Sequence, residues 1–510
     1  MKNVTLLLLT VLIISNKLYP QSYQFKGFEL NESNENFHFK FSIPQIDSTL
    51  IEANNYNYVR YSIQDYSLTS DEGYPQLPVV CFNVIIPMDV VNCKINILNK
   101  QTSEVYISKR IYPAQKGKPR IVPLDKREFS IQSSYYNSNG GKYEDLVQVS
   151  EPFILRGIKG VCVSVFPFDY SPLQNKIIIA TEIEFELTFK SNCTKITSTV
   201  TTSYSDYFNH FFVNYNSINL KSGSTEDFLI IASDEFQGSS ELDAFIYNKS
   251  ILGYNVNVFF TDETGVTNIG IKNFIQNRYD NSDTRPEFIL LIGDTDEIPY
   301  WVGHGTEPDS FKHPPTDLHY SLLDGYDYIA DVFLGRWPVR TSSELQNIIY
   351  KTIYMENNTS SESKDNVFMA SDDAYWWSEG THNSVINNHF LQEGYTNLKL
   401  YCHSYSATTA QVTNAFNTNK VFGIYSGHGT EYEWWDGPYF NQSHVNALTN
   451  SIFPFVYSFA CYTGSFDLDE CFAETWIRAY NGAVTIYGAS LWTDWYPDDI
   501  LEKELLYAKG

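Results

Sequence analysis

The sequence predicts a β-rich N-terminal part followed by an α/β part that is built on a mainly parallel sheet. In the first part, residues 183–189 alternate apolar and polar side chains with a period of two, which is typical of a strand with one wet face. In the second part, short apolar runs alternate with amphipathic helical patterns. That order is typical of a parallel sheet covered on both faces. The segment 191–225, rich in Ser, Thr, Asn and Tyr, is predicted to be an accessible linker between the two parts.

The size and charge of the chain limit the classes of protein to consider. Its 510 residues exceed what one core usually organises, and 43% of them are hydrophobic, so we expect a globular chain of two or three domains. The formal net charge of -25 argues against a nucleic-acid partner, because binding to phosphates depends on Lys and Arg. An acidic surface fits solubility, cationic substrates or bound calcium, and charge alone does not choose among them.

The N-terminus has the pattern of a secretory signal peptide. Lys2 precedes a mostly apolar stretch at 6–14, and the sequence turns polar at residue 15. This stretch is too short for a transmembrane helix, and no other stretch has the roughly 20 apolar residues that one needs. We therefore expect residues 1–20 to direct export, and the mature protein to be secreted or on the cell surface. The seven cysteines, an odd number, leave at least one free thiol there.

The apolar runs predict the strands of each part. In the β-rich part they lie at 37–43, 79–86, 93–98 and 183–189, and in the α/β part at 228–232, 256–260, 288–292, 332–334, 367–370, 398–401, 421–425, 455–459 and 483–487. One helix of the α/β part is well marked, because Thr341 and Glu344 form a capping box before a buried stripe. Ligand sites in open parallel sheets lie at the carboxyl ends of strands, so the residues after these runs are the first functional candidates.

Two predicted strand ends carry side chains suited to acyl transfer. One strand leads into Gly427-His428-Gly429 and another into Ala460-Cys461. A thiolate is the nucleophile of cysteine peptidases, and a nearby imidazole favours its ionisation and later protonates the leaving amine. Glycines beside His428 let the backbone approach a substrate, so the amides of Gly429 and Cys461 are candidates for an oxyanion hole. Taken alone, each motif is weak, because a lone cysteine is more often a buried structural thiol.

Together with further motifs, residues 228–499 resemble the gingipain-type cysteine peptidases of clan CD, which have a caspase-like fold. The motifs that carry the resemblance are Leu291-Ile-Gly-Asp294, Val332-Phe-Leu-Gly-Arg336, Tyr425-Ser-Gly-His-Gly429 and Phe459-Ala-Cys-Tyr-Thr-Gly464. The β-rich part, with Gly73-Tyr-Pro-Gln-Leu-Pro78 before a strand, is similar to that family's propeptide. The resemblance implies an exported cysteine endopeptidase that acts on proteins or peptides and is inhibited by its own propeptide.

The resemblance also implies a domain order. We expect a signal peptide at 1–20, a propeptide and linker at 21–222, and two catalytic subdomains at 223–370 and 371–510. The family's catalytic domain continues further than this sequence, which stops 49 residues after Cys461, so we expect closing elements to be missing. Two other functions stay open: a sortase-like enzyme that processes exported proteins, and an inactive adhesin or scaffold that keeps the fold.

Carried over residue by residue, the resemblance assigns the catalytic roles. Cys461 becomes the nucleophile, His428 the general acid/base, and the amides of Gly429 and Cys461 the oxyanion hole. The family's third catalytic member is a glutamate, and Asp373 stands at the aligned position. This shorter carboxylate either orients His428 or only faces the start of a helix.

The resemblance assigns a pocket for the substrate side chain as well. Arginine-specific members bind that side chain with an aspartate, and the aligned residue is Glu379. An acidic group there favours Lys or Arg at P1, because a buried cation requires a paired charge; an exposed glutamate at a helix start is the alternative. Trp492, Trp495 and Tyr496 fall where the family closes this pocket with an aromatic ring, and the sequence does not say which of them does so.

No cofactor is required for this chemistry. Calcium stabilises relatives, and acidic loops such as 294–297 are candidates for binding it, although no complete set of ligands can be read from the sequence.

Overall fold

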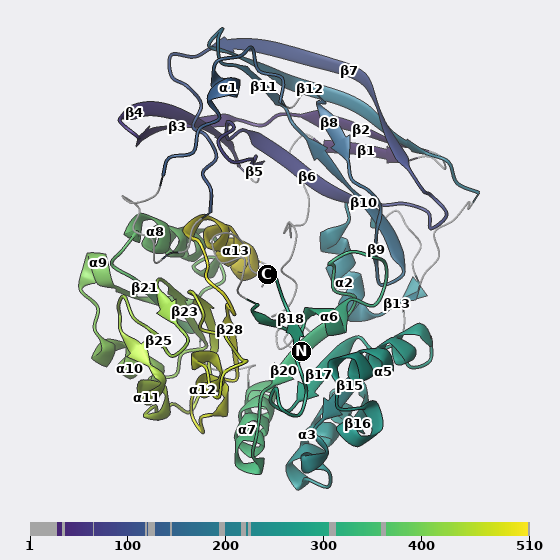
Figure 1. Cartoon of the computed structure of the whole chain (residues 1–510), viewed down its shortest axis with the longest axis vertical. Coiled ribbons are helices and arrows are strands. Elements are labelled where there is room, and N and C mark those ends of the chain that lie inside the picture. Colours follow the sequence, from purple (N-terminus) through teal and green to yellow (C-terminus); the bar gives the residue numbers. More distant parts are fainter. Residues whose placement is uncertain are drawn as a thin grey trace.

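The computed structural model describes residues 28–32, 36–64, 66–117, 120, 128–142, 145–192, 199–215, 221–222, 226–304, 313–358 and 364–507. A β-rich unit lies above two α/β units that stand side by side (Figure 1). The predicted signal peptide lies outside the described residues. None of the helices in the described ranges is long and apolar enough to cross a membrane, and the six cysteines described there are all free.

The β-rich unit is made of two antiparallel sheets that share one core. The first holds β1 (Phe28–Glu32), β2 (Asn36–Ser42), β12 (Lys176–Phe189), β11 (Phe168–Ser171) and β7 (Cys93–Tyr106); the second holds β5 (Ser67–Leu68), β6 (Pro78–Ile85), β10 (Ile158–Val165), β8 (Val147–Val149) and β9 (Phe153–Leu155). A separate hairpin joins β3 (Ile46–Ala53) to β4 (Tyr56–Ile63). The inner side chains of β2, β6, β10 and β12 form the core. The predicted alternation along 183–189 is confirmed, since Ile183, Phe185 and Leu187 are buried there.

The prediction of an accessible linker at 191–225 is wrong for its central part. Helix α2 (Thr202–Phe211) lies there, and its Tyr204 and Phe208 are 1% exposed. Both side chains belong to a hydrophobic core that also includes Phe228 of the first α/β unit. The helix forms despite its polar composition, because burying the large rings of Tyr204 and Phe208 contributes more than the weaker helix propensity of its Ser and Thr residues costs.

The first α/β unit has a four-stranded parallel sheet in the order β16-β15-β17-β20. Its strands are β15 (Glu226–Ala232), β16 (Tyr254–Phe260), β17 (Phe288–Ile292) and β20 (Phe333–Trp337). Helices α3 (Ser240–Ile251) and α7 (Ser342–Asn358) cover one face, and α5 (Asn268–Asp280) covers the other. The predicted capping box is present, because the amide of Glu344 donates to Oγ1 of Thr341 at 3.2 Å and the Thr341 amide donates to the Glu344 carboxylate at 3.2 Å.

The second α/β unit has a five-stranded parallel sheet in the order β22-β21-β23-β27-β28. Its strands are β21 (Asp365–Ala370), β22 (Thr396–Tyr401), β23 (Phe422–Ser426), β27 (Phe455–Phe459) and β28 (Thr485–Gly488). Helices α8 (Tyr375–Val385) and α13 (Trp495–Tyr507) lie over one face, and α10 (Thr409–Phe416) and α12 (Phe472–Arg478) over the other. Strand β21 pairs within this sheet, so the subdomain boundary that we placed after residue 370 lies before Asp365.

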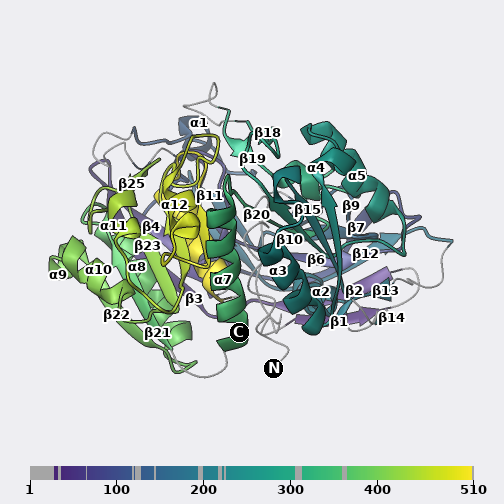
Figure 2. The ribbon, with the colours of Figure 1, turned by 90° about the horizontal axis from the view of Figure 1, so that it is seen from below.

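The two α/β units meet along α7 and α12. Seen from below, α7 stands between the two sheets (Figure 2). This arrangement confirms the predicted fold class, an α/β catalytic part with parallel sheets preceded by an all-β domain.

Candidate active site

The three predicted catalytic residues follow the carboxyl ends of adjacent strands. Asp373 comes after β21, His428 after β23 and Cys461 after β27, and these strands are neighbours in the sheet. All three strands run parallel, so their carboxyl ends meet at one edge. The fold therefore brings the three side chains together.

The glycines beside His428 are required by close packing. A Cβ atom on Gly427 would lie 2.8 Å from Cβ of Ser371, and one on Gly429 would lie 2.8 Å from the carbonyl oxygen of Cys461. Neither space admits a side chain. The backbone of Gly429 therefore lies directly against the loop that holds the thiol, where an oxyanion hole needs it.

His428 is oriented by carboxylates. Its Nε2 atom lies 3.0 Å from Oδ2 of Asp373 and 3.8 Å from Oδ2 of Asp436. Since Nε2 faces the carboxylates, Nδ1 is the nitrogen left to exchange a proton with Cys461. Burial lowers the pKa of His428, and its hydrogen bond to the Asp373 carboxylate opposes that effect. Asp373 thus reaches the imidazole despite being shorter than the family's glutamate.

Asp436 was missed by sequence reasoning. Its Oδ2 atom accepts a hydrogen bond from the amide of Asp373 at 3.2 Å, and burial raises the pKa of Asp436. It lies in a loop beyond His428 with no motif around it. Asp436 lies beside His428 because its loop packs against the residues that follow β21.

Replacing Asp373 by asparagine is expected to lower the pKa of His428 further. A carboxylate stabilises the imidazolium ion, so its removal favours the neutral ring. The measurement is an NMR titration of His428 in a Cys461→Ala background. The control is Asp372→Asn, because Asp372 lies beside Asp373 but pairs with His403 at 3.1 Å. An unchanged pKa in Asp373→Asn would show that Asp373 does not support the imidazolium ion.

The thiol of Cys461 is held by the backbone of Thr493. Its Sγ atom accepts a hydrogen bond from the amide of Thr493 at 3.2 Å and lies 3.7 Å from the Thr493 carbonyl oxygen. The residue is 4% exposed. Among the described residues, no hydrogen bond joins Cys461 to His428. The fold brings both groups to one edge of the sheet.

A side chain from the β-rich unit reaches the residues around this site. The Arg120 guanidinium donates from Nη1 to the carbonyl oxygen of Gly427 at 2.9 Å and from Nη2 to Oδ2 of Asp498 at 2.6 Å. It lies over the ring of Trp495, 4.1 Å from the centroid, and is 1% exposed. The Arg120 amide donates to the Thr493 carbonyl at 3.0 Å. Arg120 therefore shares Thr493 with the candidate nucleophile.

The predicted pocket residues differ in their contacts, and of them Trp495 packs on this guanidinium. Glu379 is buried in α8, and its carboxylate accepts hydrogen bonds from the amide and hydroxyl of Ser404 at 3.0 and 2.5 Å. It is thus not the exposed residue of the alternative interpretation. The acid that pairs with Arg120 is Asp498, which sequence reasoning missed. Of the three predicted rings, Trp495 covers the guanidinium, Tyr496 packs 5.9 Å from the ring of Trp377, and Trp492 is partly buried.

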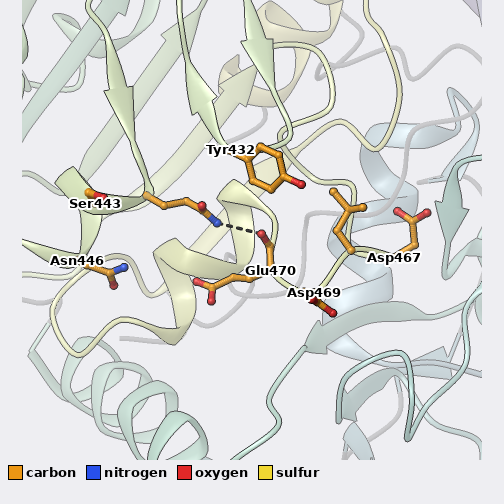
Figure 3. A pocket seen from close by; sticks show the side chains of 8 residues that line it. Tyr432, Ser443, Asn446, Asp467, Asp469 and Glu470 are labelled. Carbon is orange, nitrogen blue, oxygen red and sulfur yellow. Dashed lines mark hydrogen bonds between the residues drawn. The ribbon is translucent and has the colours of Figure 1, made fainter.

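A hollow lies apart from these residues. It has a volume of about 770 Å³ and is lined by Tyr432, Gln442, Ser443, Asn446, Asp467, Leu468, Asp469 and Glu470 (Figure 3). The amide of Gln442 donates to the carbonyl oxygen of Glu470 at 2.9 Å. None of the catalytic candidates lines this hollow.

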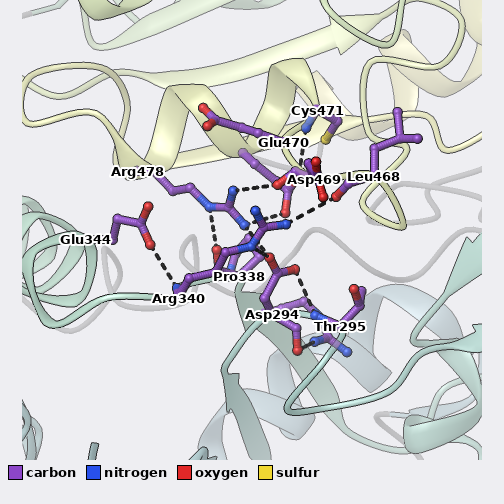
Figure 4. A network of polar contacts seen from close by, with 12 residues as sticks. Asp294, Thr295, Pro338, Arg340, Glu344, Leu468, Asp469, Glu470, Cys471 and Arg478 are labelled. Atoms are coloured by element: carbon purple, nitrogen blue, oxygen red, sulfur yellow. Dashed lines mark hydrogen bonds and ion pairs between the residues drawn. The ribbon is translucent and has the colours of Figure 1, made fainter. Parts of the chain in front are cut away.

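A buried polar network ties the loop after Cys461 to the first α/β unit. Arg478 of α12 pairs with Asp294 at 2.9 Å and with Glu474 at 2.8 Å, and it donates to the carbonyl oxygen of Pro338 at 2.6 Å (Figure 4). Arg340 also pairs with Asp294. The Asp294 carboxylate, in the acidic loop that we considered for calcium, is therefore engaged by two arginines. Within the described ranges, no group of three or more His, Cys, Asp or Glu could hold a metal ion, and calcium binding stays a prediction.

A thiol and an imidazole from neighbouring parallel strands, with a carboxylate behind the imidazole, define a site of the cysteine-peptidase class. The family model described as Peptidase family C25 matches residues 221–505, and the one described as Propeptide_C25 matches residues 28–222. The chain belongs to peptidase family C25. The predicted resemblance to gingipain-type peptidases is thereby confirmed.

Curated relatives and a solved structure agree with this assignment. The chain is 26% identical to Lys-gingipain of Porphyromonas gingivalis over 97% of its own length and 30% of that protein, and 25% identical to Gingipain R2 of Porphyromonas gingivalis over 84% and 59%. It thus spans less than two thirds of these relatives. A structure titled "Structure of Protease" is 28% identical, with a TM-score of 0.50, and the match covers 55% of this chain and 63% of that one.

Proposed function

We propose that this chain is the zymogen of an exported cysteine endopeptidase that cleaves after basic residues and prefers arginine. The observation that carries the proposal is the position of Arg120, whose side chain is paired with Asp498 while its amide binds Thr493 beside the candidate nucleophile. The pattern of a signal peptide at 1–20 supports export.

The proposed reaction is acyl transfer through a thioester. The Cys461 sulfur attacks the carbonyl carbon of the scissile bond, and His428 receives the thiol proton at Nδ1 and returns it to the departing amine. Asp373 holds the ring and supports its charged form. The amides of Gly429 and Cys461 stabilise the oxyanion. Water then attacks the thioester, His428 takes its proton, and Cys461 leaves as the thiol.

The contacts of Arg120 support a preference for arginine over lysine at P1. Its two terminal nitrogens donate to separate acceptors, the Gly427 carbonyl and the Asp498 carboxylate, while its plane lies on Trp495. A planar guanidinium spans both acceptors, but an ammonium group is a single point of charge. One hydrogen bond to a charged group contributes about 1.5–3 kcal/mol.

The same contacts support inhibition by the propeptide. Arg120 belongs to the β-rich unit that matches the Propeptide_C25 model. Its side chain occupies the place proposed for the P1 side chain, and its amide is bound as a P1 amide would be. A substrate cannot enter until this segment leaves.

The processed protein is expected to hydrolyse a fluorogenic peptide with P1 Arg about 10- to 100-fold faster, in kcat/KM, than its P1 Lys analogue. Peptides with P1 Asn, Asp or Ala are expected to be poor substrates, since they leave Asp498 without a partner. The uncut chain serves as the control and is expected to be latent on every peptide. Equal rates for all P1 residues would refute the proposal that Asp498 forms a pocket for a basic P1 side chain. No hydrolysis of any peptide would favour the inactive adhesin or scaffold.

A further inference from the structure

A second arginine of the β-rich unit is buried in the first α/β unit. Arg156 lies in the two-residue turn between β9 and β10, with φ of 48° at Arg156 and 74° at Gly157. The turn is tight, and the left-handed backbone at Arg156 is uncommon for a residue other than glycine. The arginine side chain is 8% exposed.

The guanidinium of Arg156 donates hydrogen bonds to three acceptors of the first α/β unit. It donates from Nη2 to the Glu287 carboxylate at 2.5 Å, and from Nη1 to the carbonyl oxygens of Pro286 and Asp331 at 2.7 and 3.2 Å. The carbon of the guanidinium lies 4.4 Å from the ring centroid of Tyr204, in α2 of the part that matches the propeptide model, and 5.8 Å from that of Tyr279 in α5 of the first α/β unit. A planar cation between rings and oxygens is the arrangement that recognises arginine rather than lysine.

The backbone of the same turn is bound too. The Arg156 amide donates to the Asp331 carboxylate at 2.7 Å, and the Ile154 amide donates to the Asp327 carboxylate at 3.1 Å. On either side, Leu155 and Ile158 are at most 1% exposed and join the core of the first α/β unit. The hairpin is therefore held by charge, hydrogen bonds and apolar contact together.

The acceptors are positioned by their own unit. The Glu287 carboxylate also accepts the amide of Asp227, and the Asp331 carboxylate also accepts the amides of Leu323 and Asp324. Both acids precede strands, Glu287 before β17 and Asp331 before β20. They therefore lie at the amino ends of the first sheet, whereas Cys461 follows the carboxyl end of a strand in the second sheet. Figure 1 places β9, β10 and α2 next to the first sheet and away from α8 and α13.

We propose that the first α/β unit carries a guanidinium-binding site of its own, separate from the active site, whose ligand is Arg156 of the propeptide. This site keeps the propeptide docked after the chain between the two parts has been cut, so release from the active site and dissociation from the enzyme are separate events. The proposal goes beyond the proposed peptidase function and does not require activity.

The energetic reason is the burial of both partners. Removing one member of a buried ion pair leaves an unpaired charge and mainly increases the dissociation rate. Burial raises the pKa of Glu287 and the charge of Arg156 opposes that effect, so the buried Glu287 carboxylate is costly to leave ionised without the guanidinium. Because two separated contacts bind one segment, losing the contact at Arg120 leaves the other in place at high effective concentration.

The test uses the full chain with Cys461→Ala, which prevents self-cleavage, and a recognition sequence for a site-specific protease inserted between Gly223 and Ser224. After cutting, the C-terminal piece is immobilised and the dissociation rate of the propeptide is measured. We expect Arg156→Ala to increase this rate at least about 30-fold, with a smaller increase in Arg156→Lys. Glu287→Gln, on the other side of the pair, is expected to act in the same direction.

Lys159→Ala is the matched control, because the hydrogen bonds that this basic residue of the same hairpin makes to described residues go to the carbonyl oxygens of Met88 and Val90 within the β-rich unit. Arg120→Ala, which weakens the contact at the active site, is expected to leave the cut pieces associated. Near-UV circular dichroism of the uncut variants reports whether they fold; if Arg156→Ala does not, Arg156→Lys and Glu287→Gln decide. The proposal is overturned if the Arg156→Ala propeptide dissociates no faster than the Lys159→Ala propeptide. It is also overturned if the propeptide without these substitutions dissociates as soon as the chain is cut.

Discussion

We expect Cys461→Ala to lower kcat/KM of the processed protein at least about 10⁴-fold on a P1 Arg peptide, since removing the nucleophile of a covalent mechanism leaves only binding and the oxyanion hole. The fold should be unaffected, because the Sγ atom contacts only Thr493 among the described hydrogen bonds. Fluorogenic hydrolysis measures the loss, and a thiol-specific reagent, with the labelled site mapped by mass spectrometry, should label Cys461 in the parent protein and lose that site in the variant.

Cys402→Ala is the matched control for this substitution. Cys402 follows β22 in the same sheet and is also a free thiol, but burial raises its pKa to about 11, and its Sγ donates to the carbonyl oxygen of Ala407 at 3.5 Å. We expect kcat/KM of Cys402→Ala to stay near that of the parent. Activity that survives Cys461→Ala and disappears in Cys402→Ala would show that Cys402, and not Cys461, is the nucleophile.

The parts of this site that local sequence patterns predict are those at strand ends. Apolar runs located β23 and β27, and the residues that follow them, His428 and Cys461, are recognisable because parallel neighbours present their carboxyl ends together. The family resemblance added Asp373, and the structure brings its carboxylate within 3.0 Å of the imidazole. Both the strand and the residue after it are local properties of the chain.

The parts that the sequence did not reveal depend on distant pairs. Arg120 and Asp498 are 378 positions apart, and no sequence motif around either residue predicts that they pair. Glu379 was proposed as the pocket acid because it aligns with the aspartate of arginine-specific members, whereas in the structure its carboxylate accepts hydrogen bonds from Ser404. Helix α2 was hidden for a different reason, since polar residues between its aromatic positions lowered the apparent hydrophobicity of a buried face.

Asp498→Asn is expected to lower kcat/KM for P1 Arg peptides by between roughly 30-fold and several thousand-fold, the range for truncating one partner of a buried, hydrogen-bonded charge pair. Asparagine keeps the size of the side chain but not its charge, so the P1 cation is buried without compensation. The already low rates on P1 Ala and P1 Asn peptides should change little. The loss of P1 selectivity, rather than of total activity, is therefore the quantity to measure.

The comparison that decides the identity of the pocket acid is Glu379→Gln, assayed on the same peptides. Its carboxylate accepts two hydrogen bonds from Ser404, so we expect this change to affect the free energy of unfolding more than the choice of P1. If Glu379→Gln abolishes the preference for arginine and Asp498→Asn does not, the acid is the one that the family resemblance implied. If only Asp498→Asn abolishes the preference for arginine, the carboxylate that binds Arg120 in the zymogen also selects the substrate. The propeptide and the substrate then compete for the same carboxylate.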